Sequence, residues 1–266
     1  ILMQNLFTLN KGMNYSTIDN INLNNEKGKA QCMDHHFMCQ DKPKGNPDPN
    51  FLECFVGFSD AEGCFIINRL LKKDNFITSR FTFMFKIALH KDDEKVLRYI
   101  KDKLCIGGVR LYKDECIFTV TDQKGIALLI SIFDKYNLNT SKHLDYLDFK
   151  EAFYLYLNRD KKLNPAPMNA EAFGGEEVNN KILELKNKMN TNRLHFDRPK
   201  NSEIIITKYW LLGFIEGDSS FLLRRHTLTP TFSMEITGVQ LPVLGKIKKF
   251  LENSALGFDI YSLYKL

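Results

Sequence analysis

Two acidic residues stand at matching places in a stretch that the chain contains twice. Residues 55–65 read F-V-G-F-S-D-A-E-G-C-F, and residues 211–221 read L-L-G-F-I-E-G-D-S-S-F. The last acid is Glu62 in the first copy and Asp218 in the second. Two unpaired carboxylates that meet in a partly dry site repel each other, and a divalent cation is the usual compensation. The repeat therefore predicts a metal site shared between two copies of one motif.

Each acid follows two small residues spaced four apart, Gly57 and Ala61 in one copy and Gly213 and Gly217 in the other. This spacing lines one face of a helix and permits close approach of two backbones. We expect the two motif helices to pack together, with both acids at the same end of the interface. The alternative is ordinary helix-packing sequence with incidental acids. Against it, the helix dipole disfavours an acid at a C-terminus, yet both copies place one there.

Periodicity around the first motif predicts helix, two strands, helix, two strands, helix. The expected ranges are 52–62, 64–71, 80–90, 92–104, 108–112, 116–121 and 123–136, with a further helix at 144–157. Such an order predicts an α+β unit with a four-stranded antiparallel sheet backed by helices. The second copy shows strands at 220–226 and 231–237, a helix at 241–252 and the start of a third strand at 256–266.

Composition divides the chain into four parts. We expect a poorly ordered Asn- and Lys-rich arm (residues 1–50), a first domain (51–157), a linker with one helix near 178–189 (158–206) and an incomplete second domain (207–266).

The chain has 266 residues, 44% hydrophobic and 26% charged, and a net charge of +5 that by itself indicates little about nucleic acid. The hairpin at residues 63–90 is more informative, because five cationic residues there face one acid. Strand alternation predicts one apolar face that builds the core and one mixed face that can meet a ligand. The predicted core face consists of Phe65, Ile67, Phe81, Phe83, Phe85 and Ile87.

Six cysteines in a chain of this length do not indicate a disulfide framework, so a reducing compartment is expected. Cys32, His35, His36 and Cys39 are possible zinc ligands, but four ligands within eight residues wrap one ion awkwardly. No apolar run reaches membrane-spanning length.

The paired motifs, the αββαββα order and the Asn- and Lys-rich linker resemble a single-chain LAGLIDADG homing endonuclease of the organellar intron type. The resemblance implies two pseudo-symmetric αββαββα domains with saddle-shaped antiparallel sheets, in a monomer that cuts long double-stranded DNA sites. It implies two or more Mg²⁺ ions and a mitochondrial location. Glu62 and Asp218 would be catalytic metal ligands, and Lys142 would support the attacking water. The implied helix-interface residues are Gly57, Asp60, Ala61, Gly213, Glu216 and Gly217.

The same resemblance implies that the mixed faces of the two sheets read the DNA major groove. Each candidate could also be a solvated strand residue or a phosphate contact. The candidates are Asn68, Lys72, Arg80, Thr82 and Lys86 in the first sheet, and Arg224, His226, Thr231 and Glu235 in the second.

Two departures from the family pattern matter. Ser219 replaces the closing glycine of the second motif, which could shift Asp218. The second copy lacks its last strand and closing helix, so we expect this chain to bind DNA weakly and to cut poorly, whereas a completed reading frame could be active. Two alternatives remain: a maturase that binds its own intron RNA, and an inactive relic. Glu62→Gln should abolish cleavage but spare splicing assistance.

Overall fold

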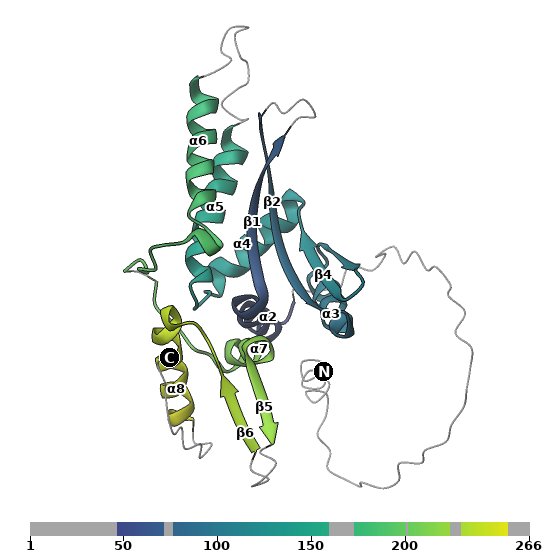
Figure 1. The fold of residues 1–266 in the computed structure, drawn as a ribbon, viewed down its shortest axis with the longest axis vertical. Helices are drawn as coiled ribbons and strands as arrows, with labels where there is room; N and C mark the ends of the chain where they lie inside the picture. Colours follow the sequence, from purple (N-terminus) through teal and green to yellow (C-terminus); the bar gives the residue numbers. More distant parts are fainter. Residues whose placement is uncertain (1–46, 72–76, 160–172, 201, 224–229, 255–266) are drawn as a thin grey trace, which may run out of the picture. The chain divides into compact units, whose positions relative to one another are not determined.

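A computed structural model describes residues 47–71, 77–159, 173–200, 202–223 and 230–254 (Figure 1). All of them belong to one compact unit, Pro47–Leu266. Several predictions lie outside the described residues: most of the N-terminal arm with its four possible zinc ligands, and the third strand of the second copy. The same holds for three predicted DNA contacts, Lys72, Arg224 and His226.

The sheet of the first half has four antiparallel strands in the order β1-β2-β4-β3. They are β1 (Gly63–Leu71), β2 (Ile77–His90), β3 (Gly108–Leu111) and β4 (Glu115–Val120). Each of these strands was predicted, and their antiparallel pairing confirms the α+β class. We use "first half" for the elements from α2 to α5 and "second half" for those from α7 to α8.

The motif helix α2 (Pro49–Glu62) begins three residues earlier than predicted. Asp48 caps it by accepting a hydrogen bond from the backbone N–H of Asn50 at 3.1 Å, and Pro49 occupies the first turn, where its missing N–H costs nothing. The 3₁₀ turn η1 (Lys91–Asp93) and the helices α3 (Glu94–Leu104), α4 (Gln123–Lys135) and α5 (Lys142–Arg159) follow.

The predicted core face of the sheet is buried. Its six residues are at most 5% exposed, and their rings pack against aromatic residues of α4 and α5. Phe65 lies 5.5 Å from Phe133 and 5.3 Å from Phe149, measured between ring centroids. Of the alternate residues, Asn68 and Thr82 are exposed, and others such as Lys86 are half-buried. The period-two pattern therefore identified both faces correctly, because alternate residues of a strand point to opposite sides.

The segment predicted as a linker contains the expected helix, α6 (Phe173–Asn187), which packs along α5 (Figure 1). The 3₁₀ turn η3 (Asn190–Asn192) follows, and Asn190 donates from its side chain to the carbonyl of Phe65 at 2.9 Å. Arg193 then forms ion pairs with Asp145 and Asp148 on α5 and is 10% exposed. These contacts hold the end of this segment on the first half.

The second half comprises α7 (Lys208–Asp218), β5 (Ser219–Leu223), β6 (Pro230–Met234), η4 (Gly238–Gln240) and α8 (Leu241–Asn253). β6 ends at Met234, three residues before its predicted end, and the predicted end of β5 lies outside the described residues. Phe221 pairs with Phe232 as Phe65 pairs with Phe85. However, Phe221 is 67% exposed and Phe65 2%, because no described helix of the second half covers Phe221 as α4 and α5 cover Phe65.

Among the described helices, none has the length and apolar character needed to cross a membrane.

Candidate active site

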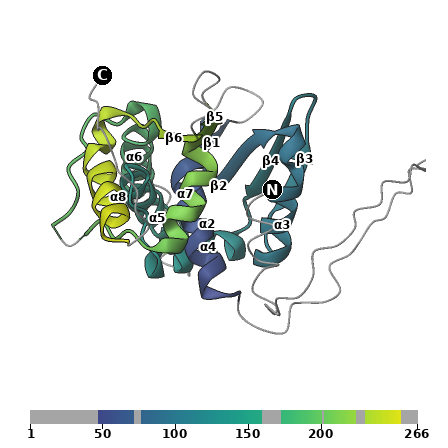
Figure 2. The ribbon, with the colours of Figure 1, turned by 90° about the horizontal axis from the view of Figure 1, so that it is seen from below.

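The motif helices α2 and α7 lie side by side, as the paired small residues predicted (Figure 2). Their approach is reciprocal. A Cβ atom added to Gly57 would lie 1.9 Å from the carbonyl oxygen of Trp210, and one added to Gly213 would lie 1.9 Å from the carbonyl oxygen of Cys54. Trp210 precedes Gly213 by three residues, as Cys54 precedes Gly57. The two helices are therefore related by a local twofold axis.

This close approach places the acids at one end of the helix pair. Glu62 is the last residue of α2, and Asp218 is the last residue of α7. Gly217 makes room for the opposite acid, since a Cβ atom there would lie 3.1 Å from Cγ and 3.3 Å from Oε1 of Glu62. The fourth small residue, Ala61, touches the same place, with its own Cβ 2.3 Å from that added atom.

The residues that end the two helices differ in type but share an extended backbone. Gly63 has φ −72° and Ser219 has φ −140°, so neither uses the left-handed conformation that favours glycine. Gly63 is required by space instead, because an added Cβ would lie 2.5 Å from the carbonyl oxygen of Ser59. The Ser219 hydroxyl donates to the carbonyl of Ile215 at 2.5 Å. A serine thus satisfies a helix-end carbonyl where the first motif has glycine.

One lysine serves both acids. Burial raises the pKa of Glu62, Lys142 opposes this rise, and the charge of Asp218 adds to it. Burial also raises the pKa of Asp218, again opposed by Lys142. The Lys142 ammonium donates to the carbonyl of Ala61, next to Glu62. Burial lowers the pKa of Lys142, while Asp60, Asp218 and Glu62 act to raise it. The Lys142 side chain is thus not simply solvated at the start of α5, since it is partly buried and reaches this site.

Asp60 lies fully buried beneath the site and accepts four hydrogen bonds. They come from the N–H of Asn139 at 2.6 Å, the N–H and hydroxyl of Thr140 at 3.1 and 2.6 Å, and the indole N–H of Trp210 at 2.8 Å. Burial raises the pKa of Asp60, and these donors act to lower it. Four donors leave no acceptor for a carboxyl proton, so the network suits the ionised form. Asp60 thereby joins α2, α7 and the loop before α5.

Glu216 occupies the matching position in the second motif but has a different environment. It is half-buried, and burial raises its pKa. Burial raises the pKa of the Cys54 thiol to about 12, and the charge of Glu216 adds to this rise. Within the described part of the chain, no hydrogen bond to the Glu216 side chain is found. The two motifs are therefore symmetric in backbone and asymmetric in the role of this acid.

The outward face of the first sheet carries polar residues in register. Asn68 pairs with Thr82, and Lys86 pairs with Cys64 at the end nearest Glu62. Arg80 is exposed near the other end. The pairing also places Arg110 of β3 beside Ile117, on the same outward face. Sequence reasoning missed Arg110, although its place between the apolar residues Val109 and Leu111 in a predicted strand could have suggested it.

The second sheet contributes less of its predicted surface. Thr231 pairs with Leu222 and is partly exposed. Glu235 lies just beyond β6, which ends three residues earlier than predicted. An open cleft of about 320 Å³ lies here, lined by Gly217, Asp218, Ser219, Ser220, Ser233 and Glu235. The cleft gives solvent access to the second motif acid.

Comparison with known proteins agrees with this geometry. A family profile described as LAGLIDADG endonuclease matches residues 55–153, from the first motif to α5. A "probable intron-encoded endonuclease Cox1-I1b" of Schizosaccharomyces pombe is 32% identical over 219 residues, which is 80% of this chain. The chain belongs to the LAGLIDADG endonuclease family.

Solved structures of the family share the fold. The LAGLIDADG homing endonuclease I-GzeII, solved in complex with its DNA target, is 26% identical, with a TM-score of 0.61 over 76% of this chain and 71% of that one. I-SmaMI bound to cleaved DNA is 20% identical, with a TM-score of 0.61 over 82% of this chain and 77% of that one, and supports the LAGLIDADG fold alone.

The chain covers only part of its curated relatives in the LAGLIDADG family. It spans 52% of the S. pombe protein. It also spans 32% of the "uncharacterized mitochondrial protein RF1" of Saccharomyces cerevisiae, which is 30% identical over 178 residues.

Proposed function

We propose that the chain is a site-specific endonuclease that hydrolyses phosphodiester bonds in double-stranded DNA at the end of the α2–α7 helix pair. The observation that carries the proposal is the meeting of Glu62 and Asp218 at one end of two reciprocally packed helices, with Lys142 beside both. Family membership and the printed descriptions of the relatives add support.

The donor set fits a divalent cation such as Mg²⁺. Glu62 and Asp218 are half-buried carboxylates, and the charge of Asp218 helps to raise the pKa of Glu62. Such oxygen ligands are the kind that Mg²⁺ accepts, and the ion usually keeps several waters. The described residues contain no group of three His, Cys, Asp or Glu side chains placed to share one ion. Glu62 and Asp218 would therefore hold the cation or cations together with waters and phosphate oxygens. When bound, the cation supplies Lewis-acid stabilisation of charge on a reacting phosphate.

The residues of the chain have distinct parts in this proposal. Glu62 and Asp218 hold negative charge at one place. Lys142, partly buried beside them, offers an N–H donor and a positive charge to a water or phosphate oxygen. Asp60 keeps the loop before Lys142 in place through the Asn139 and Thr140 amides.

The proposed DNA surface is the outward face of the first sheet. Asn68, Thr82 and Arg110 present hydrogen-bonding side chains there, and Lys86 adds positive charge near the acids. A twisted antiparallel sheet of this kind can lie along the major groove, where base edges are distinguishable. We also propose a mitochondrial location, since one relative is named as a mitochondrial protein and others as intron-encoded endonucleases of fungi.

The test is Glu62→Gln, which keeps the shape of the side chain and removes its charge. Glu216→Gln is the matched control, because Glu216 is also a half-buried motif glutamate but does not end its helix. The substrate is a plasmid library with a randomised insert, from which cleaved molecules are recovered and sequenced. Loss of the Glu62 charge should lower the single-turnover rate about 1,000-fold, since such a charge contributes several kcal/mol to the transition state.

Glu216→Gln should keep the rate within about 10-fold of the wild-type value, because Glu216 is not among the acids whose charge acts on Lys142. Equal rates for Glu62→Gln and the wild type would refute the assignment of the site. Recovery of no cleaved molecule by the wild-type chain, with Mg²⁺ present, would refute the proposed activity of this chain.

A further inference from the structure

The loop that carries Lys142 into the site is held through its backbone groups. Asp60 accepts from the N–H groups of Asn139 and Thr140. Arg198 donates to the carbonyls of Leu138 and Asn139, at 3.1 and 2.5 Å. These contacts secure the loop as far as Thr140. They do not reach Ser141, the residue that immediately precedes Lys142.

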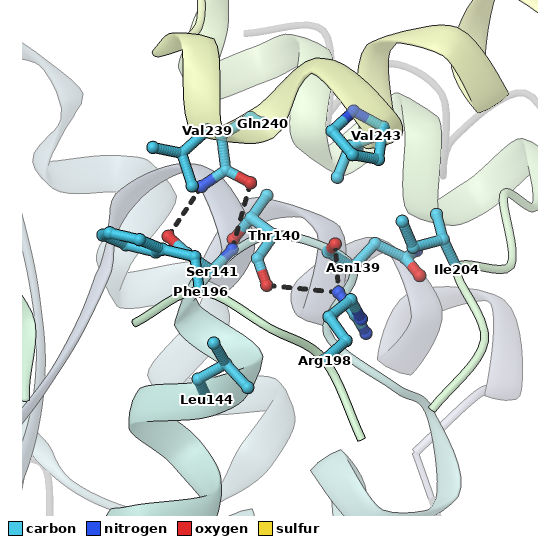
Figure 3. Close-up of a pocket in the computed structure, with 11 residues that line it drawn as sticks. Asn139, Thr140, Ser141, Leu144, Phe196, Arg198, Ile204, Val239, Gln240 and Val243 are labelled. Atoms are coloured by element: carbon cyan, nitrogen blue, oxygen red, sulfur yellow. Dashed lines mark hydrogen bonds between the residues drawn. The ribbon is translucent and has the colours of Figure 1, made fainter. Parts of the chain in front are cut away.

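Ser141 is held from the second half of the chain. Gln240, at the end of η4, accepts from the N–H of Ser141 through Oε1 at 3.0 Å. The Gln240 side-chain amide also donates to the Ser141 hydroxyl at 2.6 Å (Figure 3). In the described part of the chain, Gln240 is the one partner of both groups. A single side chain thus makes two hydrogen bonds to the residue before the lysine.

Helix α5 begins at Lys142, and the carbonyls of the two preceding residues, Thr140 and Ser141, accept hydrogen bonds from its first turn. The carbonyl of Ser141 accepts from the N–H of Leu144 at 3.0 Å, and that of Thr140 from His143 at 3.1 Å. The Thr140 hydroxyl accepts from the N–H of Lys142 at 3.2 Å. A change at Ser141 therefore alters the direction in which α5 begins, and with it the reach of Lys142 to the carbonyl of Ala61.

We propose that Gln240 is a positioning residue for Lys142: the second half, through its two hydrogen bonds to Ser141, holds the lysine of the first half at the two motif acids. The catalytic consequence rests on the proposed endonuclease function. The position of the Lys142 amine in the folded chain does not depend on that function, so this part of the proposal can be tested by itself. Gln240 touches no reacting atom and acts through Ser141.

The small cavity around these residues limits how the loop can relax. It has a volume of about 60 Å³, room for about two water molecules, and Gln240 and Ser141 line it together with apolar residues such as Val243. Loss of the glutamine side chain would leave the Ser141 N–H facing this space. Water can enter and satisfy that N–H, but it cannot fix the direction of the loop.

The test uses the full chain and three variants. Gln240→Ala removes both hydrogen bonds. Gln240→Glu keeps an acceptor for the N–H of Ser141 and can accept from its hydroxyl, so it is the conservative rescue. Lys246→Ala is the matched control on α8, because it removes an exposed contact with Glu203 at 3.5 Å and leaves the loop untouched.

The first readout is acylation of lysine amines by an N-hydroxysuccinimide ester, followed by peptide mass spectrometry. Gln240→Ala should raise the labelling rate of Lys142 about 3-fold or more relative to Lys150 on the same helix, because local opening exposes the amine. Gln240→Glu and Lys246→Ala should keep the wild-type ratio. An unchanged ratio in Gln240→Ala would overturn the proposal, and so would a rise shared by all lysines.

The second readout separates binding from catalysis on duplexes recovered by the cleavage selection. Gln240→Ala should lower the single-turnover rate about 10-fold while the Kd for DNA stays within about 2-fold, since misplacement of a catalytic group affects the transition state. Gln240→Glu should restore the rate. If Kd rises as much as the rate falls, Gln240 serves DNA binding and the proposal is refuted. If the wild type cuts nothing but the labelling ratio rises, the positioning stands and the proposed function fails.

Discussion

Replacement of Gly213 by alanine tests the helix contact on which the site depends. The added Cβ atom would lie 1.9 Å from the carbonyl oxygen of Cys54 and 2.8 Å from the N atom of Phe58. Both are backbone atoms of α2, so no side-chain rotation can relieve the overlap. The two helices must move apart by about 1 Å before the new methyl group fits.

The expected cost follows from two opposing effects. Overpacking at such a contact costs about 3 kcal/mol, at the upper end of the usual range, because the obstacle is backbone. The higher helix propensity of alanine relative to glycine stabilises the folded chain by about 1 kcal/mol. The free energy of unfolding should therefore fall by about 2 kcal/mol. For a chain of this size, the melting temperature should fall by about 4–8 °C.

Gly245→Ala provides the matched control. Gly245 lies within α8, and an added Cβ atom there meets nothing within 4 Å. The substitution should raise the unfolding free energy by about 0.5–1 kcal/mol through helix propensity alone. Thermal unfolding followed by circular dichroism measures both variants. A Gly213→Ala protein as stable as Gly245→Ala would refute the close approach of α2 and α7.

Two further predictions concern buried polar groups near the site. Asp60→Asn should lower the unfolding free energy by about 3 kcal/mol in urea titrations, since the amide N–H₂ would face groups that also donate; a loss below about 0.5 kcal/mol would contradict the network. Burial, aided by the Arg198 charge, lowers the pKa of His143 from 6.5 to about 4. As the pH falls below 6.5, His143 takes up a proton in the unfolded chain but not in the folded chain. The free energy of unfolding is therefore unaffected by His143 above pH 6.5 and falls progressively between pH 6.5 and about pH 4. His143→Gln should remove about 2–3 kcal/mol of the stability difference between about pH 7 and about pH 4.5, and an unchanged difference would show that His143 is not buried in its neutral form.

The predictable parts of the fold are those with a local period. The core face of β1 and β2 follows from alternation, and the small face of α2 follows from the four-residue spacing of Gly57 and Ala61. These patterns can be recognised in the sequence because backbone geometry fixes the period of a strand or helix. The ends of the motif helices were predicted as well, since Glu62 and Asp218 are followed by small residues.

Element boundaries in the second half were predicted less well. β6 ends at Met234, so Glu235 does not lie on the strand as expected. The alternation of polar and apolar residues continues past Met234 through Glu235, Ile236 and Thr237, so nothing local marks the end of pairing. The reason for a glycine at position 63 is likewise visible only in the structure, because its backbone is extended and the requirement is for space beside the carbonyl of Ser59.

By itself, the sequence determined that the chain repeats one helix-ending acid, that small residues precede it, and that two sheets follow. The tertiary structure decided which groups surround those acids. Asp60 meets Thr140 across 80 positions and Trp210 across 150, and Gln240 meets Ser141 across 99. Hydrogen bonds between such distant residues leave no periodic trace in the sequence. Their partners become known only when packing brings the chain segments together, and the same packing brings Lys142 close to Glu62 and Asp218.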